Sequence, residues 1–332
     1  MEEEQLKELL AENDFEFIQK LRKSEFGHIY QVKKNNEIQK VRIIQRKQGN
    51  YTDIDISKCC FRKETGNDIV YGFIMKEMEG ILFEILIEKE FDMVKKLGEG
   101  GFGLAYEVKK QNKYYAAKLI KVEKKEKDNE ANIIKEFRGQ NIVKVNYVIE
   151  KTIGNNAYNV IIMEEAPFKS LRYLINDLKN NNLFNLIYNS PFEIIGDNLL
   201  KFFISQLIQG LEILNRNNFC HFDIKPDNIL IFNRFYVKWS DFGLLRDIDN
   251  IKCENNDNMI QVPGGTRGYF PPEYYQQKGK VYKEQAFKSD YFALGAAIYF
   301  IKYGKNMLNY IENNDNLMTS NTILELIEKK NR

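Results

Sequence analysis

The chain has 332 residues, of which 43% are hydrophobic and 29% are charged, as in soluble globular proteins rather than disordered or fibrous ones. Its formal net charge of +2 creates no overall field that would attract nucleic acid or a membrane surface, so neither is an expected partner. The four cysteines lack metal-ligand spacing and the density of a secreted disulfide scaffold, and no apolar run is long enough to span a bilayer. These features predict a cytoplasmic protein, with the nucleus not excluded, built of one large domain or two smaller ones.

A weak internal repeat relates residues 17–44 to residues 93–120, an offset of 76 positions. The matching pairs include Leu21 and Leu97, Phe26 and Phe102, Gly27 and Gly103, Tyr30 and Tyr106, and Val32 and Val108. Residues 69–86 also echo residues 158–175, and the helical segment that precedes the latter is absent from the first copy. We interpret residues 1–90 as a degenerate, shortened copy of the region that follows, although unrelated β-hairpins would show similar alternation.

From residue 91 the pattern predicts three successive β-strands separated by turns, the third of which reads YYAAKLIKV. A charged amphipathic helix follows, with Glu130, Ile134 and Phe137 on one face. Farther along, a helical stripe runs from Leu200 to Leu214, and residues 291–301 are apolar all round, as in a buried helix. An α+β fold is therefore expected, with a β-rich first part and a mainly helical second part.

Three glycines, Gly98, Gly100 and Gly103, lie between the first two of these strands. Without side chains, the backbone N–H groups of such a turn can approach phosphates closely. Lys118 on the third strand and Glu130 on the helix have a spacing that suits an ion pair between strand and helix. Each signal is weak by itself, because glycine turns are common in hairpins and most lysines of a Lys-rich segment are solvated.

The decisive motifs lie downstream, in the segments CHFDIKPDNIL and WSDFGLL. Their polar residues are Asp223, Lys225, Asn228 and Asp241. In order and spacing these segments resemble the catalytic loop and the magnesium-binding segment of the protein kinase family. The resemblance covers the chain from residue 91 to its end. It implies a bilobal fold with a small lobe at residues 91–165 and a large lobe at residues 166–332, preceded by a small-lobe-like region at residues 1–90.

The resemblance also implies ATP and Mg²⁺ as cofactors and protein hydroxyl groups as substrates. Asp223 would accept or orient the proton of the substrate hydroxyl, and Lys225 would steady the γ-phosphate. Asn228 and Asp241 would coordinate Mg²⁺, because hard amide and carboxylate oxygens suit that cation.

The nucleotide would be held largely by residues of the small lobe. Lys118, paired with Glu130, would hold the α- and β-phosphates. The residues that would surround the adenine ring and the phosphates are Leu97, Gly98, Gly100, Gly103, Ala105, Ala116, Lys118, Met163, Glu164, Ala166 and Leu230. Because family members generally carry valine at the position of Ala105, nucleotide binding weaker by roughly 1 kcal/mol is expected.

Substrate choice and the role of the histidine also follow from the resemblance. Thr266 in GTRGYFPPE, together with Lys225, favours serine and threonine hydroxyls over those of tyrosine. His221 would be structural rather than catalytic, with its ring stacked on Phe242 and a bond to Asp290.

One departure from the family lies beside the catalytic aspartate. Phe222 stands where an arginine commonly pairs with a phosphorylated activation loop. Residues 245–264 contain no Ser, Thr or Tyr that could be phosphorylated. We therefore expect activity that is independent of loop phosphorylation.

The C-terminus is shorter than in the family, with 42 residues after Asp290. Glu273 would lose its usual arginine partner and remain as an unpaired buried carboxylate. We expect marginal stability, an exposed apolar patch, or a partner that covers the shortened large lobe; a truncated gene product is the alternative.

The first copy of the repeat lacks the residues that would bind phosphates. Arg22 and Ser24 stand at the positions of Gly98 and Gly100, and Arg42 stands at that of Lys118. The first copy is therefore not expected to bind ATP productively.

Three functions are compatible with these motifs. The first is an active serine/threonine protein kinase, and the second is a nucleotide-binding pseudokinase that acts as a scaffold or regulator. The third, a small-molecule kinase of similar fold, is disfavoured by the peptide-docking segment GTRGYFPPE. The first two differ in whether phosphoryl transfer occurs.

Overall fold

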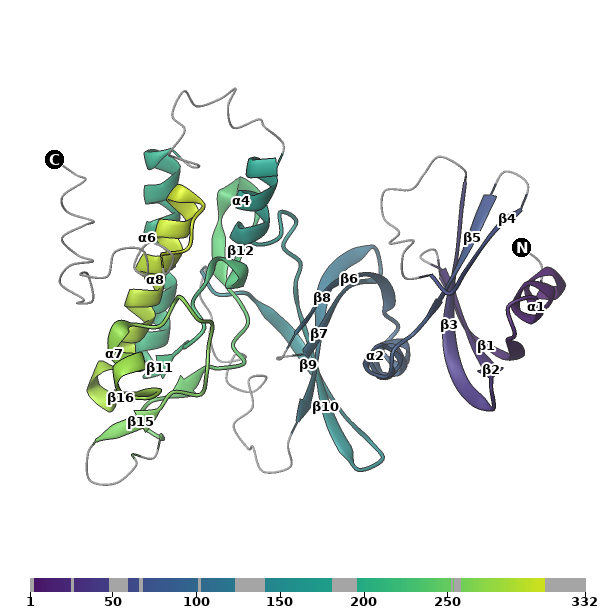
Figure 1. Cartoon of the computed structure of the whole chain (residues 1–332), viewed down its shortest axis with the longest axis horizontal. Helices are drawn as coiled ribbons and strands as arrows, with labels where there is room; N and C mark the ends of the chain where they lie inside the picture. Colours follow the sequence, from purple (N-terminus) through teal and green to yellow (C-terminus); the bar gives the residue numbers. More distant parts are fainter. Residues whose placement is uncertain are drawn as a thin grey trace. The chain divides into compact units, whose positions relative to one another are not determined.

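The computed structural model describes residues 3–24, 27–47, 59–65, 68–100, 103–122, 141–180, 196–251, 253 and 258–307. These residues form α-helices and antiparallel β-sheets, so the mixed α and β composition is as predicted (Figure 1). The chain divides into two compact units, one formed by residues 1–124 and 148–162 and the other by residues 125–147 and 163–332.

The first unit begins with helix α1 (Glu3–Ala11) and a five-stranded sheet in the order β1-β2-β3-β5-β4. The strands are β1 (Glu16–Ser24), β2 (Gly27–Lys34), β3 (Glu37–Lys47), β4 (Phe61–Thr65) and β5 (Asp68–Ile74). Leu6, Leu9 and Leu10 lie on one face of α1 because they are three to four residues apart, and this face packs on the sheet.

A second helix and sheet follow with the same arrangement. Helix α2 (Glu77–Glu88) precedes a five-stranded sheet in the order β6-β7-β8-β10-β9. The strands are β6 (Asp92–Gly100), β7 (Gly103–Lys110), β8 (Lys113–Val122), β9 (Val145–Ile153) and β10 (Asn156–Glu164). Leu82, Phe83, Ile85 and Leu86 of α2 are buried against this second sheet.

The two sheets agree in register at the same offset of 76 residues. Glu16 pairs with Lys33 as Asp92 pairs with Lys109, and both β1 and β6 carry two register shifts at corresponding positions. The pairing of β2 with β3 likewise matches that of β7 with β8. Left-handed backbone recurs at the corresponding turns, at Asp14 and Glu90, Asn35 and Gln111, and Asn36 and Asn112.

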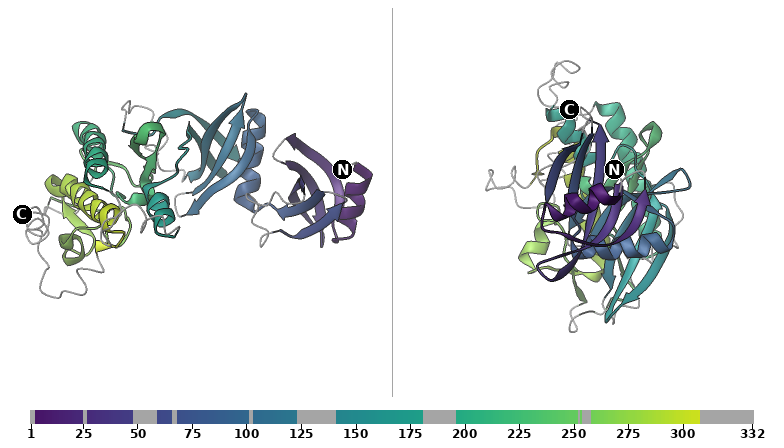
Figure 2. Two further views of the ribbon diagram at one scale, coloured as in Figure 1. Left: turned by 90° about the horizontal axis from the view of Figure 1, so that it is seen from above. Right: turned by 90° about the vertical axis from the view of Figure 1, so that its right-hand side faces the viewer.

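Helix α2 lies between the two sheets of the first unit, as both figures show (Figures 1 and 2). One side of the helix packs on the second sheet, while Ile29 of β2, 4% exposed, joins the same apolar cluster from the first sheet. The two sheets are therefore connected through one shared core.

The second unit has three longer helices, α4 (Leu171–Asn180), α6 (Asp197–Arg216) and α8 (Ala286–Tyr303), and one short helix, α7 (Pro272–Gln276). The predicted stripe on α6 is confirmed, since Leu200, Phe203, Leu207, Leu211 and Leu214 are buried and only Ile204 is less so. Helix α8 ends at Tyr303 and is capped by Gly304, which has a left-handed backbone and donates its N–H to the carbonyl of Phe300.

Three two-stranded antiparallel ladders accompany these helices, so the unit is mixed rather than purely helical. They are β11 (Phe219–Cys220) with β14 (Arg246–Asp247), β12 (Ile229–Ile231) with β13 (Val237–Trp239), and β15 (Met259–Gln261) with β16 (Lys280–Tyr282). Single 3₁₀ turns occupy Pro226–Asn228, Asn233–Phe235 and Lys283–Gln285. The indole N–H of Trp239, which is fully buried, donates to the carbonyl of Leu207 at 3.0 Å and fixes β13 on α6.

Two predictions about this unit need correction. Helix α8 is not buried all round, because Tyr291 is 42% exposed in the part of the chain that the structure describes. Glu273 is only partly buried, in the first turn of α7, so the expected cost of a fully buried carboxylate does not apply.

The helix predicted around Glu130 and Ile134, and all residues after Met307, lie outside the described residues. None of the described helices has the length and apolar character needed to cross a membrane.

Candidate active site

The backbone of the segment from His221 to Asp223 is fixed by a buried carboxylate on α8. Asp290, 1% exposed, accepts hydrogen bonds from the N–H of His221 at 2.6 Å and the N–H of Phe222 at 2.9 Å. Burial raises the pKa of Asp290, while the electrostatic influence of the His221 ring and the two N–H donors act in the opposite direction. The same carboxylate thus satisfies two buried backbone donors that would otherwise be unpaired.

Asp223 is the point on which three polar side chains converge. The carboxylate is only 3% exposed, and its Oδ2 accepts from Nζ of Lys225 at 2.7 Å and from Nδ2 of Asn228 at 2.9 Å. Its Oδ1 accepts from the hydroxyl of Thr266 at 2.8 Å. Nζ of Lys225 also donates to this hydroxyl at 2.8 Å. The structure therefore brings together Asp223, Lys225, Asn228 and Thr266 in one hydrogen-bonded group.

His221 makes the contacts expected of a structural residue. Its ring lies 5.1 Å from that of Phe242, centre to centre, and its backbone N–H bonds to Asp290. Nδ1 accepts from the N–H of Asp223 at 3.3 Å, and Nε2 is 3.2 Å from the carbonyl of Ser240. Both ring nitrogens are thus used to hold backbone in this fully buried side chain.

Asn228 and Asp241 are placed by the ladder between β12 and β13. Ile229 pairs with Trp239, and one step beyond, the N–H and hydroxyl of Ser240 donate to the carbonyl of Asn228 at 2.9 and 3.1 Å. Asp241 follows directly, with a left-handed φ of 59°. Because the amide nitrogen of Asn228 is bonded to Asp223, its amide oxygen is the atom that could ligate a cation. The amide oxygen of Asn228 and the carboxylate of Asp241 are ligands of the type that Mg²⁺ prefers when it also binds phosphates.

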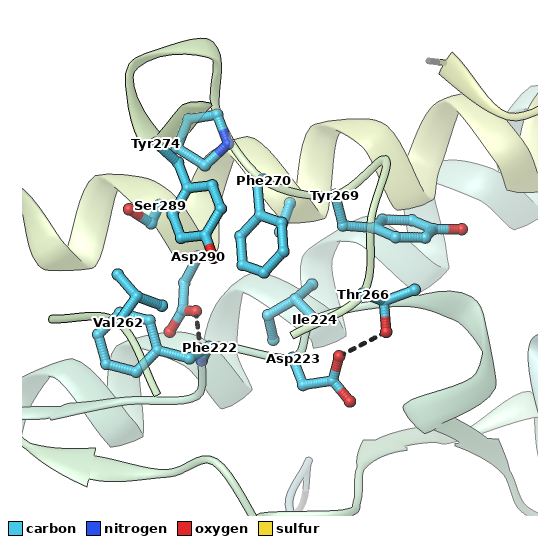
Figure 3. Close-up of a pocket in the computed structure, with 12 residues that line it drawn as sticks. Phe222, Asp223, Ile224, Val262, Thr266, Tyr269, Phe270, Tyr274, Ser289 and Asp290 are labelled. Atoms are coloured by element: carbon cyan, nitrogen blue, oxygen red, sulfur yellow. Dashed lines mark hydrogen bonds between the residues drawn. The ribbon is translucent and has the colours of Figure 1, made fainter. Parts of the chain in front are cut away.

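Phe222 is the residue that stands where an arginine is common in the family, and it is buried. Its side chain is 6% exposed, and its φ of 59° is unusual for a bulky residue. Together with Val262, Thr266 and Tyr274 it lines a small cavity of about 10 Å³ (Figure 3). The segment that precedes Thr266 thus lies beside the buried Phe222.

Arg172 at the start of α4 is a residue of this region that sequence reasoning missed. Its guanidinium donates to Oδ2 of Asp227 at 3.0 Å and to the hydroxyl of Tyr269 at 2.9 Å. It also lies 4.0 Å from the centre of the Phe300 ring on α8. Arg172 therefore connects the loop of Asp223 with the segment that follows Thr266. No motif in the sequence marks it.

The predicted nucleotide-binding residues of the first unit lie on one face of the second sheet. Gly98, Ala105 and Lys118 form one row across β6, β7 and β8, because Gly98 pairs with Ala105 and Ala105 pairs with Lys118. Ala116 is two residues from Lys118 on β8 and therefore lies on the same face. Lys118 is 9% exposed, whereas Leu97 is 43% exposed. Glu130 lies outside the described residues.

The three glycines of the first hairpin differ in what their surroundings require. A Cβ on Gly103 would lie 2.1 Å from the carbonyl oxygen of Leu119, and its φ is +125°. A Cβ on Gly98 or Gly100 would meet nothing within 4 Å. The fold thus requires glycine at Gly103, while the open space above the other two leaves room for a ligand.

Replacing Gly103 by alanine is expected to lower the free energy of unfolding by about 2 kcal/mol or more, because both the backbone strain and the clash must be relieved. Gly98→Ala is the matched control and should change stability by less than about 1 kcal/mol. Urea unfolding of both variants measures the difference. Equal costs at the two positions would show that the clash at Gly103 is not a real constraint.

The remaining predicted nucleotide-binding residues lie in the second unit. Met163 and Leu230 are partly buried and pack on the same apolar core. The carboxylate of Glu164 accepts from the N–H of Lys144 at 2.7 Å and from Nζ of Lys238 at 2.6 Å. Leu230 forms a bridge with Ser170, so the segment that includes Ala166 runs close to β12.

Comparison with known proteins agrees with this geometry. A buried aspartate with a lysine and an asparagine in one loop, followed by a second aspartate after a short hairpin, is characteristic of phosphoryl-transfer enzymes. The family model described as protein kinase domain matches residues 91–331. The chain therefore belongs to the protein kinase family.

Curated relatives are distant serine/threonine kinases. A probable serine/threonine-protein kinase of Clostridium perfringens is 26% identical over 64% of this chain and 29% of the relative. Aurora kinase of Saccharomyces cerevisiae is 29% identical over 59% of this chain and 49% of the relative. A serine/threonine-protein kinase of Candida albicans is 33% identical over 52% of this chain and 22% of the relative. The chain spans less than half the length of each of these relatives.

Proposed function

We propose that this chain is an ATP-dependent and Mg²⁺-dependent kinase that phosphorylates serine and threonine hydroxyls of protein substrates. The observation that carries the proposal is the convergence of Lys225, Asn228 and Thr266 on the buried carboxylate of Asp223. The proposal includes a bilobal organisation, with a small lobe at residues 91–165 and a mainly helical large lobe at residues 166–332. Membership of the protein kinase family supports it.

Asp223 is the proposed acceptor for the proton of the substrate hydroxyl. Its carboxylate and the ammonium of Lys225 already hold one hydroxyl between them, that of Thr266, at 2.8 Å from each. This arrangement supports an aliphatic hydroxyl as the substrate group, because a threonine hydroxyl satisfies both partners at once. Lys225, once it faces a phosphate, is placed to steady the negative charge that moves during transfer.

Asn228 and Asp241 are the proposed ligands of Mg²⁺, and the metal would neutralise charge on the phosphates when bound. The side-chain amide of Asn228 donates through its nitrogen to Asp223, so its oxygen is the atom that would act as a ligand. Lys118, paired with Glu130, is the proposed contact to the α- and β-phosphates. The proposed adenine and phosphate contacts are Leu97, Gly98, Gly100, Gly103, Ala105, Ala116, Met163, Glu164, Ala166 and Leu230.

The packing of Phe222 supports activity without loop phosphorylation. An arginine at this position would need an anionic partner, whereas the buried ring of Phe222 needs only apolar neighbours, which Val262 and Tyr274 supply. Treatment of the purified chain with a phosphatase is therefore expected to leave its transfer rate unchanged.

The proposal is tested by Mg²⁺-dependent transfer of labelled γ-phosphate from ATP to generic protein substrates and to the chain itself. Lys118→Met should lower the transfer rate by about 100-fold or more, since it removes a preorganised cation from the phosphates. Lys121→Met on the same strand is the matched control, because Lys121 is exposed and its side chain lies on the opposite face.

An equal rate for the two lysine variants would contradict the role of Lys118. If the unsubstituted chain is folded and is stabilised by ATP but transfers no phosphate, the chain is instead a nucleotide-binding pseudokinase.

A further inference from the structure

The first sheet presents a face that corresponds, residue by residue, to the proposed nucleotide face of the second sheet. Arg22 pairs with Ile29, and Ile29 pairs with Arg42, as Gly98 pairs with Ala105 and Ala105 with Lys118. This row of the first sheet therefore has two arginines and an isoleucine where the second sheet has a glycine, an alanine and a lysine.

Each of the three residues in this first row contacts the segment that begins with α2 and continues into β6. Nε and Nη2 of Arg22 donate to Oδ1 of Asp92 at 3.1 and 3.0 Å. Nη2 of Arg42 donates to the carbonyls of Met93 and Val94, both at 2.9 Å. Ile29 is buried in the apolar cluster formed by α2 and the second sheet. The face is thus filled by protein at the position of Arg22, whereas a Cβ on the corresponding Gly98 would meet nothing within 4 Å.

The occupying segment leads directly to the glycine hairpin. Strand β6 starts at Asp92, which Arg22 holds, and ends at Gly100. At the other end of α2, Glu79 accepts from the hydroxyl of Tyr106 and from Nζ of Lys96, both at 3.0 Å. Lys96 in turn donates at 2.8 Å to Glu99, the residue between two of the glycines.

We propose that this face of the first sheet is a docking site for the α2–β6 segment of the same chain, and that Arg22 and Arg42 are positioning residues for the glycine hairpin. The first sheet then takes no nucleotide, because β6 and α2 occupy the corresponding face. It acts instead on the affinity of the second sheet for ATP, an effect that rests on the proposed kinase function.

The test is the double variant Arg22→Ala/Arg42→Ala in the full chain. The KM for ATP should rise by about fivefold or more, the usual lower range for energetically coupled sites, while kcat at saturating ATP stays the same. Backbone amides of residues 92–100 should exchange hydrogen faster, because the start of β6 has lost its anchors. Arg62→Ala is the matched control, since this arginine pairs with Glu64 within the first sheet, and it should alter neither quantity.

A charge exchange between Arg22 and Asp92 provides a second measurement if the double alanine variant fails to fold. Arg22→Asp and Asp92→Arg should each speed amide exchange in residues 92–100, and their combination should restore protection. Absence of rescue, or unchanged exchange and KM in the alanine variant, would overturn the proposal. Faster exchange with an unchanged KM would overturn the positioning role.

The outcome is separable from that of the proposed kinase function. If the unsubstituted chain transfers no phosphate, the kinase proposal fails, and hydrogen exchange in residues 92–100 still decides whether the first sheet anchors β6. Faster exchange in the alanine variant then supports the docking site, and unchanged exchange overturns it.

Discussion

Replacing Asp223 by asparagine is expected to lower kcat by about 10²–10⁴-fold, the usual contribution of a positioned proton acceptor. The substitution keeps the size of the side chain but removes the negative charge on which Lys225, Asn228 and Thr266 converge. It also replaces one carboxylate oxygen by an amide N–H₂ group. This group then faces either the donors of Lys225 and Asn228 or the hydroxyl of Thr266. The loss should therefore appear in kcat more than in the KM for ATP.

The measurement for Asp223→Asn is steady-state transfer of labelled phosphate, with thermal unfolding to show that the variant is folded. Asp249→Asn is the matched control, because Asp249 belongs to the same unit, is exposed, and bonds to Asn218 away from the Asp223 group. A kcat within fivefold of the unsubstituted chain would rule out Asp223 as the proton acceptor.

Replacing Asp290 by alanine is expected to lower the free energy of unfolding by about 3–5 kcal/mol. Two buried backbone donors, the N–H groups of His221 and Phe222, would lose their acceptor, and each such loss costs about 1–3 kcal/mol. The cavity left around the shortened side chain on α8 would add to this cost. Because the same bonds hold the loop of Asp223, transfer activity should fall with stability.

Chemical unfolding of Asp290→Ala and Asp290→Asn measures this effect. The asparagine variant retains one acceptor oxygen and should lose about half as much stability. Asp249→Ala controls for removal of a carboxylate at the surface. A cost for Asp290→Ala below about 1 kcal/mol would show that the backbone of residues 221–222 is held by other contacts.

The sequence was most informative where short-range rules decide the structure. The stripe on α6 follows from helical periodicity, and its five most regular members are buried. The grouping around Asp223 lies largely within one loop, so order and spacing along the chain indicated it. The repeat was also recognisable, because turn residues and strand alternation recur at a fixed offset.

Contacts between distant parts of the chain were not predictable in the same way. The arginines at positions 22 and 42 were recognised only as residues that replace phosphate-binding ones, and their partners lie 70 and about 50 residues away. Arg172 was missed because its partners come from three separate segments. The exposure of Tyr291 and Glu273 was misjudged because neither an apolar run nor a resemblance to a family motif states which side of an element meets solvent.

Helix α2 gives the two sheets of the first unit a common evolutionary constraint. Repeated modules usually diverge independently, since a change in one leaves the interior of the other intact. Here Leu82, Phe83, Ile85 and Leu86 share one cluster with Ile29 of the first sheet and with the second sheet. A substitution at the buried positions of this helix therefore changes the packing of both sheets. Selection on one of the two sheets thereby constrains the other.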